Sequence, residues 1–167
     1  MQPERNRAEV LAHARAQTDL LFGLVRPDSL YDRPIPERHR IVFYLGHLEA
    51  SDWNQLAAEL NLPAFHPTFD RLFAFGIDPD SNGLPLDKAS DWPAIEEVLA
   101  YNGRVRRHLD AALARVPEER FHVAVEHRLM HAETFAYMLH NLPHQKKIAP
   151  AKAQLAASGP PPEGHLV

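Results

Sequence analysis

The sequence contains no cysteine, and this single absence removes several kinds of chemistry. Without thiols the chain forms no disulfide, supplies no thiolate nucleophile and offers no sulfur ligand to a metal. Residues 1–17 also lack the apolar core of a secretory signal. A chain without disulfides or a secretory signal fits a reducing compartment, so we expect a cytoplasmic location.

Long apolar runs and an excess of positive charge are missing as well. The apolar runs fall far short of the roughly 20 residues that a membrane-spanning helix needs. With 18 Lys and Arg against 22 Asp and Glu, the formal net charge is −4, which indicates no basic surface for nucleic acid. We therefore expect a soluble protein whose partners are neither membranes nor nucleic acids.

What the sequence does have is apolar residues at helical spacing. They predict four helices over residues 4–25, 37–60, 90–116 and 118–142, and no convincing alternating strand. The middle of the second segment, IVFYLGHLEA, is apolar almost all round and predicts the most buried helix. Four helices without strands predict an all-α protein, a four-helix bundle. Such bundles build metal sites from side chains on facing helices.

Two segments lie outside the predicted helices. Residues 61–90 form a long aromatic-rich loop between the second and third helices, and we expect this loop to be an ordered cover over one end of the bundle. Residues 146–167 are rich in proline and alanine, which is the composition of a tail or linker. The expected organisation is therefore a bundle over residues 1–145, followed by the tail.

Histidine is the residue type that points to chemistry. His127 and His131 lie four residues apart in VEHRLMHAET, inside the last predicted helix. At 100° per residue their side chains are about 40° apart, on the same face as Phe135 and Met138, so both point into the core. Two imidazoles at this spacing reach one divalent ion. Imidazole suits Fe, Ni, Zn and Cu alike, so the residue type does not select the metal.

A third ligand must come from another helix, and His47 is the best candidate because it lies near the middle of the most buried one. The alternative is that all three are core histidines, each hydrogen-bonded to a backbone carbonyl. Three inward-facing imidazoles favour the metal. Glu133 lies about 160° from His131 around the helix, so we expect it to support the site indirectly rather than to bind the ion. The pattern identifies no catalytic residue.

The chain resembles the DinB-like helical domain in four stretches: FYLGHLEASDWN, FDRLFAFGIDPDSNG, AIEEVLAYNGRVRRHL and VEHRLMHAETFAYMLHNLP. It is most similar to the version at the N-terminus of hercynine oxygenases, the iron-dependent sulfoxide synthases of ergothioneine biosynthesis. The specific features are Gly-His on the second helix and His-x-x-x-His-x-Glu on the last. The resemblance implies that His47, His127 and His131 bind a non-haem iron, and it matches Glu133 to the family's glutamate.

Two departures from that family bear on function. The family has Glu directly after the first histidine of the pair, where this chain has Arg128. Family members also continue into a second domain that resembles sulfatase-modifying factors and supplies much of the substrate pocket and a catalytic tyrosine. The final residues PPPEGHLV resemble the lead-in to such a domain. The resemblance thus implies a partner domain of this kind, in cis or in trans, and it carries over the metal site more directly than the sulfoxide synthase reaction.

Three functions are open on these observations. The chain is the metal-binding part of a non-haem iron oxygenase, with Fe(II) as the cofactor. Alternatively, it is a stand-alone DinB-like thiol transferase or hydrolase, in which Fe, Zn, Ni or Mn activates a bound thiol or water. The third reading is a non-catalytic bundle for assembly, and DinB-like bundles often pair as homodimers.

Overall fold

The structure is a computed structural model and describes residues 6–74 and 86–149. Regular structure in these residues is helical, apart from an isolated antiparallel bridge between Val25 and Lys147. The predicted all-α class is confirmed. The α-helices are α1 (Arg7–Gly23), α2 (Ile41–Leu56), α3 (Pro67–Leu72), α4 (Ile95–Ala112) and α5 (Glu118–Asn141). Short 3-10 helices are η1 (Pro27–Ser29), η2 (Ala89–Asp91), η3 (Leu113–Arg115) and η4 (His144–Lys146).

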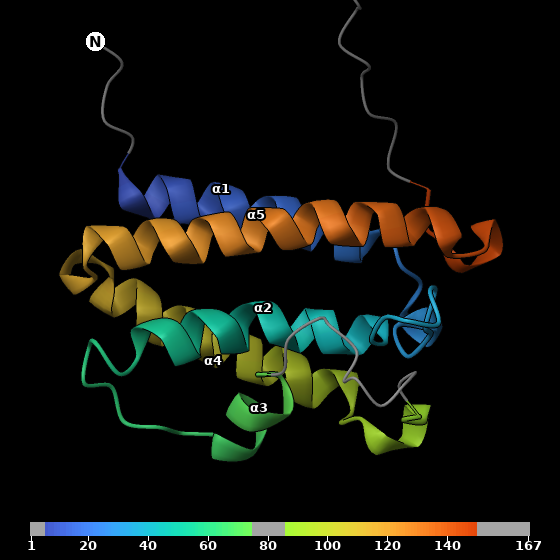
Figure 1. Cartoon of the computed structure of the whole chain (residues 1–167), viewed down its shortest axis with the longest axis horizontal. Helices are drawn as coiled ribbons and strands as arrows, with labels where there is room; N and C mark the ends of the chain where they lie inside the picture. The colour runs from blue at the N-terminus through green and yellow to red at the C-terminus, as the bar shows by residue number, and fades with distance from the viewer. Residues whose placement is uncertain (1–5, 75–85, 150–167) are drawn as a thin grey trace, which may run out of the picture.

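The four long helices form two packed pairs. Helix α1 packs along α5 and α2 along α4, and the pairs meet through α2 and α5 (Figure 1). Helix α3 lies against α2. Residues 41–50 of α2 are all buried, so the expectation that this is the most buried helix is confirmed. None of the helices in the described ranges combines the length and the apolar character that crossing a bilayer requires.

Helix α2 begins at Ile41, so the predicted start at residue 37 is wrong. The reason is tertiary. The N–H of Ile41 donates to Asp32 O (3.0 Å), and the N–H of Val42 donates to Leu30 O (2.7 Å). The preceding segment therefore satisfies backbone donors that a helix start leaves free, and no earlier helical turn is needed.

The predicted end of the second helix, at residue 60, is also too late. The regular α-helix ends at Leu56, and a turn continues to Leu60, whose N–H donates to Leu56 O. Asn61 then adopts a positive φ of 52°. Asparagine tolerates this left-handed conformation better than most residues, and the turn that follows the helix ends there.

The third predicted helix starts late for a similar reason. Ser90 and Asp91 belong to the separate turn η2, and α4 begins at Ile95 after Ala94. Trp92 between them is extended, and its ring packs against Phe43 and Phe73. Burying this aromatic side chain against two others favours the break over a continuous helix.

The aromatic segment between α2 and α4 is partly helical rather than a plain loop. It contains α3, and Phe69 and Phe73 from this region are buried against the core. Residues 75–85, which include Phe75, lie outside the described residues. The predicted helix start at residue 4 and residues 150–167 of the predicted tail lie outside them too. Of the tail, Ile148 returns to the end of α1, where its N–H donates to Leu24 O (2.8 Å).

Replacing Gly46 by alanine tests how closely α2 is covered. A Cβ at Gly46 would lie 2.6 Å from three atoms of the buried Phe73 ring. We expect Gly46→Ala to lower the free energy of unfolding by about 1–3 kcal/mol, because the ring is rigid and has no room to shift. Urea denaturation measures the change.

Gly103→Ala is the matched control, because Gly103 also lies inside a long helix. The nearest atom to its Cβ would be the end of the flexible Arg107 side chain, at 3.5 Å. Alanine favours a helix interior by up to about 1 kcal/mol over glycine, so this variant should be neutral or stabilised. Equal changes in the two variants would contradict the packing argument.

Candidate metal centre

Three histidine side chains from two helices meet in the core. Nε2 of His131 lies 3.2 Å from Nε2 of His47 and 3.1 Å from Nε2 of His127. One ligand atom of each residue lies within 4.8 Å of the others. An ion held at roughly 2.0–2.1 Å from two nitrogens separates them by about 2.9 Å at a right angle and about 3.4 Å at the tetrahedral angle. The observed spacings fall inside this interval.

The hydrogen bonds on the far side of the rings orient two of them. Nδ1 of His47 lies 2.6 Å from Phe73 O, and a carbonyl only accepts, so Nδ1 carries the proton and Nε2 presents its lone pair. Nδ1 of His127 lies 3.3 Å from the hydroxyl of Ser51. Nδ1 of His131 is buried and has no hydrogen-bonding partner among the described residues.

Hydrogen bonds alone do not satisfy such a cluster. A neutral imidazole has one proton, and that of His47 is already committed to Phe73 O. Three nitrogens that face one another then have too few protons to pair every lone pair between them. A divalent cation among the three Nε2 atoms would satisfy them all at once, so these residues fit a bound metal.

Burial keeps the three rings neutral at physiological pH. It lowers the pKa of His47, against the hydrogen bond to Phe73 O, which raises it. Burial, then the nearby His47 and Arg128, lower the pKa of His127 to about 4. Burial, then the other two histidines, Arg128 and Arg38, lower the pKa of His131 to about 3. A metal would therefore meet free lone pairs, with no proton to displace.

Phe73 supports His47 in a way that the sequence analysis missed. Its carbonyl accepts from the His47 ring, while its own ring lies over Gly46. Phe43 stacks on the ring of His47, with a centroid distance of 4.9 Å. The signal in the sequence was Gly46 itself, because a glycine inside an apolar helix marks a close approach.

Arg128 is the second group that sequence reasoning missed, and it is fully buried. Its guanidinium lies 2.6 Å from Asp52 and 3.0 Å from Glu49, both on α2, and these three side chains are each 1% exposed. Arg106 on α4 also binds Glu49, at 2.8 Å. Arg128 stands where the resembling family has Glu, and here it pairs α5 with α2 beside the histidines.

The two carboxylates respond differently to this environment. Burial by itself would raise the pKa of Glu49, but Arg128, Arg106 and Arg15 together hold it below its usual value. Burial raises the pKa of Asp52, and the Glu49 charge adds to the rise although Arg128 opposes it. Glu49 is therefore the more firmly ionised of the two, while Asp52 makes the shorter contact with Arg128, 2.6 Å against 3.0 Å.

Glu133 lies on the exposed face of α5. No hydrogen bond within the described ranges joins it to His47, His127 or His131. The site as described thus consists of three histidines, and its neighbours are Ser51 and Phe73.

Most of the chain matches a known protein family. A family model described as the DinB superfamily matches residues 10–144. The chain belongs to the DinB superfamily. The matched residues include His47, His127 and His131, so the histidine cluster is part of the DinB domain.

The DinB domain is also similar to a curated protein, ergothioneine biosynthesis protein 1 of Neurospora crassa. The two are 34% identical over 125 residues, which is 67% of this chain and 14% of that relative. The chain therefore spans a small part of the relative's length.

Removing Arg128 tests the buried ion cluster. Arg128→Met would leave Glu49 and Asp52 without their guanidinium, and we expect a loss of about 3–5 kcal/mol in the free energy of unfolding. The control is Arg120→Met on the same helix, where a half-exposed arginine lies 3.5 Å from Glu59. Arg120→Met should lower the free energy of unfolding by less than about 1 kcal/mol. A similarly small loss in Arg128→Met would contradict the importance of the buried ion cluster.

The histidines predict how stability depends on pH in the metal-free protein. The folded-state pKa of His131 is about 3 against 6.5 for a free histidine, so below about pH 6.5 the unfolded chain binds protons that the folded chain does not. Stability should therefore be full above this pH and fall as the solution is acidified. We expect a smaller fall between about pH 7 and about pH 5 in His131→Gln than in wild type. Urea denaturation with a chelator present measures stability against pH for both proteins. If the two proteins lose stability in parallel, His131 is not the group responsible.

Proposed function

We propose that this DinB domain binds one divalent metal ion through His47, His127 and His131. The observation that carries the proposal is the convergence of their Nε2 atoms, at 3.1 and 3.2 Å from the central His131. Burial of the rings and their low pKa values support it, because ligand nitrogens must be unprotonated.

We further propose that the metal is Fe(II) and that the domain serves a non-haem iron oxygenase of the ergothioneine type. Three neutral nitrogen ligands leave further coordination positions for small ligands, and imidazole is a suitable donor for Fe(II). His127 is only partly buried, so the side of the cluster next to it lies nearest to solvent. The likeness to ergothioneine biosynthesis protein 1 favours this reaction class. Zn, Ni and Mn are the competing ions.

The roles of the chain's own residues follow from their contacts. The imidazoles would hold the ion, and the Phe73 carbonyl orients His47 by accepting its Nδ1 proton. Ser51 is close enough to orient His127 in the same way. A bound Fe(II) would supply redox chemistry with dioxygen. The chain spans 14% of its relative, and following the resemblance to hercynine oxygenases we place much of the substrate pocket in a sulfatase-modifying-factor-like domain, in cis or in trans.

Metal analysis of the purified chain tests the first proposal. We expect one ion per chain after reconstitution with Fe(II). His47→Ala, His127→Ala and His131→Ala should each weaken metal affinity more than the roughly 10- to 100-fold lost when a residue that only orients a ligand is removed. Two controls lie on α5: His122→Ala removes an exposed histidine, and Glu133→Ala removes an exposed carboxylate. Both should keep the ion.

Metal analysis distinguishes a three-histidine metal site from three core histidines that bind no ion. Wild type without stoichiometric metal, or a His47→Ala protein with unchanged binding, would refute the three-histidine centre. Nitric oxide added to the Fe(II) form should give a high-spin iron–nitrosyl EPR signal, since open positions are expected. A metal-loaded protein without this signal would contradict the oxygenase role while leaving metal binding intact.

A further inference from the structure

Helix α3 carries the Phe73 carbonyl that reaches His47. It has only 6 residues, and it lies against α2 in the segment between α2 and α4 (Figure 1). Phe73 caps its C-terminal end. The last carbonyls of a helix have no partner within it, so this end of α3 presents acceptors to its neighbours. The 2.6 Å contact between Phe73 O and Nδ1 of His47 uses one of them.

A second carbonyl from the same end of α3 is also bound to α2. Nδ2 of Asn54 donates to the backbone oxygen of Asp70 (2.9 Å). Asn54 follows His47 by about two helical turns, so both side chains lie on one face of α2. The end of α3 is therefore held against that face at two points, one at Asp70 O and one at Phe73 O.

The side chain of Asp70 ties α3 to a second helix. The hydroxyl of Tyr101, on α4, donates to Oδ1 of Asp70 (2.7 Å), and both residues are buried. Removing one partner of a buried hydrogen bond leaves the other unsatisfied, which costs more than the bond itself contributes. Asp70 thus joins α3 to α4 through its side chain and to α2 through its backbone.

Apolar packing fixes the ring of Phe73 more directly than its carbonyl. The ring packs against those of Phe69 and Trp92, at centroid distances of 5.5 and 6.1 Å. The peptide plane turns about the backbone dihedrals, and the two bonds of Asp70, three residues earlier, restrain the backbone of this last turn. A hydrogen bond weakens steeply as its angle departs from linear, so a small rotation here would loosen the bond at His47.

We propose that Asp70 and Tyr101 position the metal ligand His47 through the Phe73 carbonyl. Tyr101 holds Asp70, and Asp70 holds the end of α3. Phe73 O then keeps the proton of His47 on Nδ1 and its lone pair on Nε2. Neither Asp70 nor Tyr101 belongs to the histidine cluster, so both act through Phe73 rather than on the ion. The consequence for the ion rests on the proposed function, whereas the orientation of His47 does not.

The bond at His47 can be followed without metal. In the chelator-treated full chain with ¹⁵N-labelled histidine, the Nδ1–H of His47, assigned with His47→Gln, should exchange slowly with water because it is buried and bonded. Tyr101→Phe removes only the hydroxyl, and we expect this proton to exchange roughly 2- to 10-fold faster, the factor that one net hydrogen bond represents. Asp70→Ala should act alike, and the double variant should add little, because both changes remove one bond.

Metal binding measures the consequence for the ion. With Co(II) as the probe, Tyr101→Phe and Asp70→Ala should each weaken affinity roughly 2- to 10-fold and shift the visible bands of the bound ion, which report ligand geometry. Asp70→Asn should restore wild-type affinity and spectrum, because an amide oxygen still accepts from Tyr101. A general loss of stability would not alter the spectrum of the folded, loaded protein.

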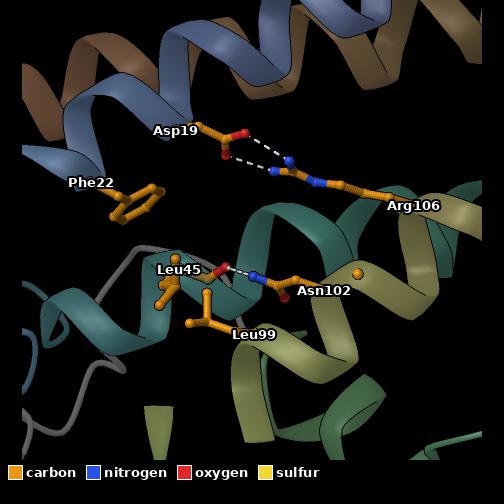
Figure 2. A pocket seen from close by; sticks show the side chains of 7 residues that line it. Asp19, Phe22, Leu45, Leu99, Asn102 and Arg106 are labelled. Atoms are coloured by element: carbon orange, nitrogen blue, oxygen red, sulfur yellow. Dashed lines mark hydrogen bonds and ion pairs between the residues drawn. The ribbon is translucent and has the colours of Figure 1, made fainter. Parts of the chain in front are cut away.

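Asn102→Ala is the matched control. Asn102 follows Tyr101 on α4, is buried, and donates to Leu45 O (2.8 Å), so its bond joins α4 to α2 without involving α3 (Figure 2). This variant should leave both the exchange at His47 and the Co(II) spectrum unchanged.

Four results would overturn the proposal. They are a wild type without a protected Nδ1–H at His47, wild-type exchange in Tyr101→Phe and Asp70→Ala, an equal effect of Asn102→Ala, and faster exchange with no change in bound Co(II). A wild type that binds no Co(II) would instead refute the three-histidine centre, and the exchange measurement would then decide by itself whether Asp70 and Tyr101 orient His47.

Discussion

The arrangement of the helices depends on one buried guanidinium, that of Arg128, and on the carboxylates of Glu49 and Asp52 that neutralise it. An unpaired charge in the interior costs several kcal/mol, so the helices must adopt the register in which the three groups meet. Apolar packing is less exacting, because many apolar arrangements of similar volume are tolerated. Thr18 of α1 also lies 3.4 Å from Arg128, and Arg106 of α4 binds Glu49. The cluster therefore reaches all four long helices.

This register is also the one that brings together the three histidines of the proposed metal site. His127 directly precedes Arg128 on α5, and His47 comes two residues before Glu49 on α2. A slip of one helical turn would separate the charges and the imidazoles together. The ion cluster and the apolar core do not require a metal, so the bundle has its own means of holding the histidines in place. If the cluster binds an ion as proposed, this arrangement orders the ligands beforehand and so reduces the entropic cost of binding.

The histidine site was accessible to sequence reasoning because its parts are local. His127 and His131 share a helical face, and His47 lies in the most apolar helix, so periodicity alone directs all three inward. Other features depend on partners distant in sequence. The start of α2 at Ile41 follows from carbonyls of the preceding segment, and the partners of Arg128 come from a different helix. A lone arginine on an apolar face has no local signal for its counter-ions, although two acidic residues in the apolar α2 were a usable hint.

Two glycines inside long helices differ in their surroundings. Glycine costs helix stability in both places relative to alanine. At Gly46 a close contact is present, because the Phe73 ring occupies the space of a Cβ and its carbonyl orients His47. At Gly103 the nearest described atom to a Cβ would be Arg107 Nη1 at 3.5 Å, which is an ordinary contact. The first glycine is explained by packing within the chain. Packing therefore requires glycine at residue 46 and leaves residue 103 open to alanine.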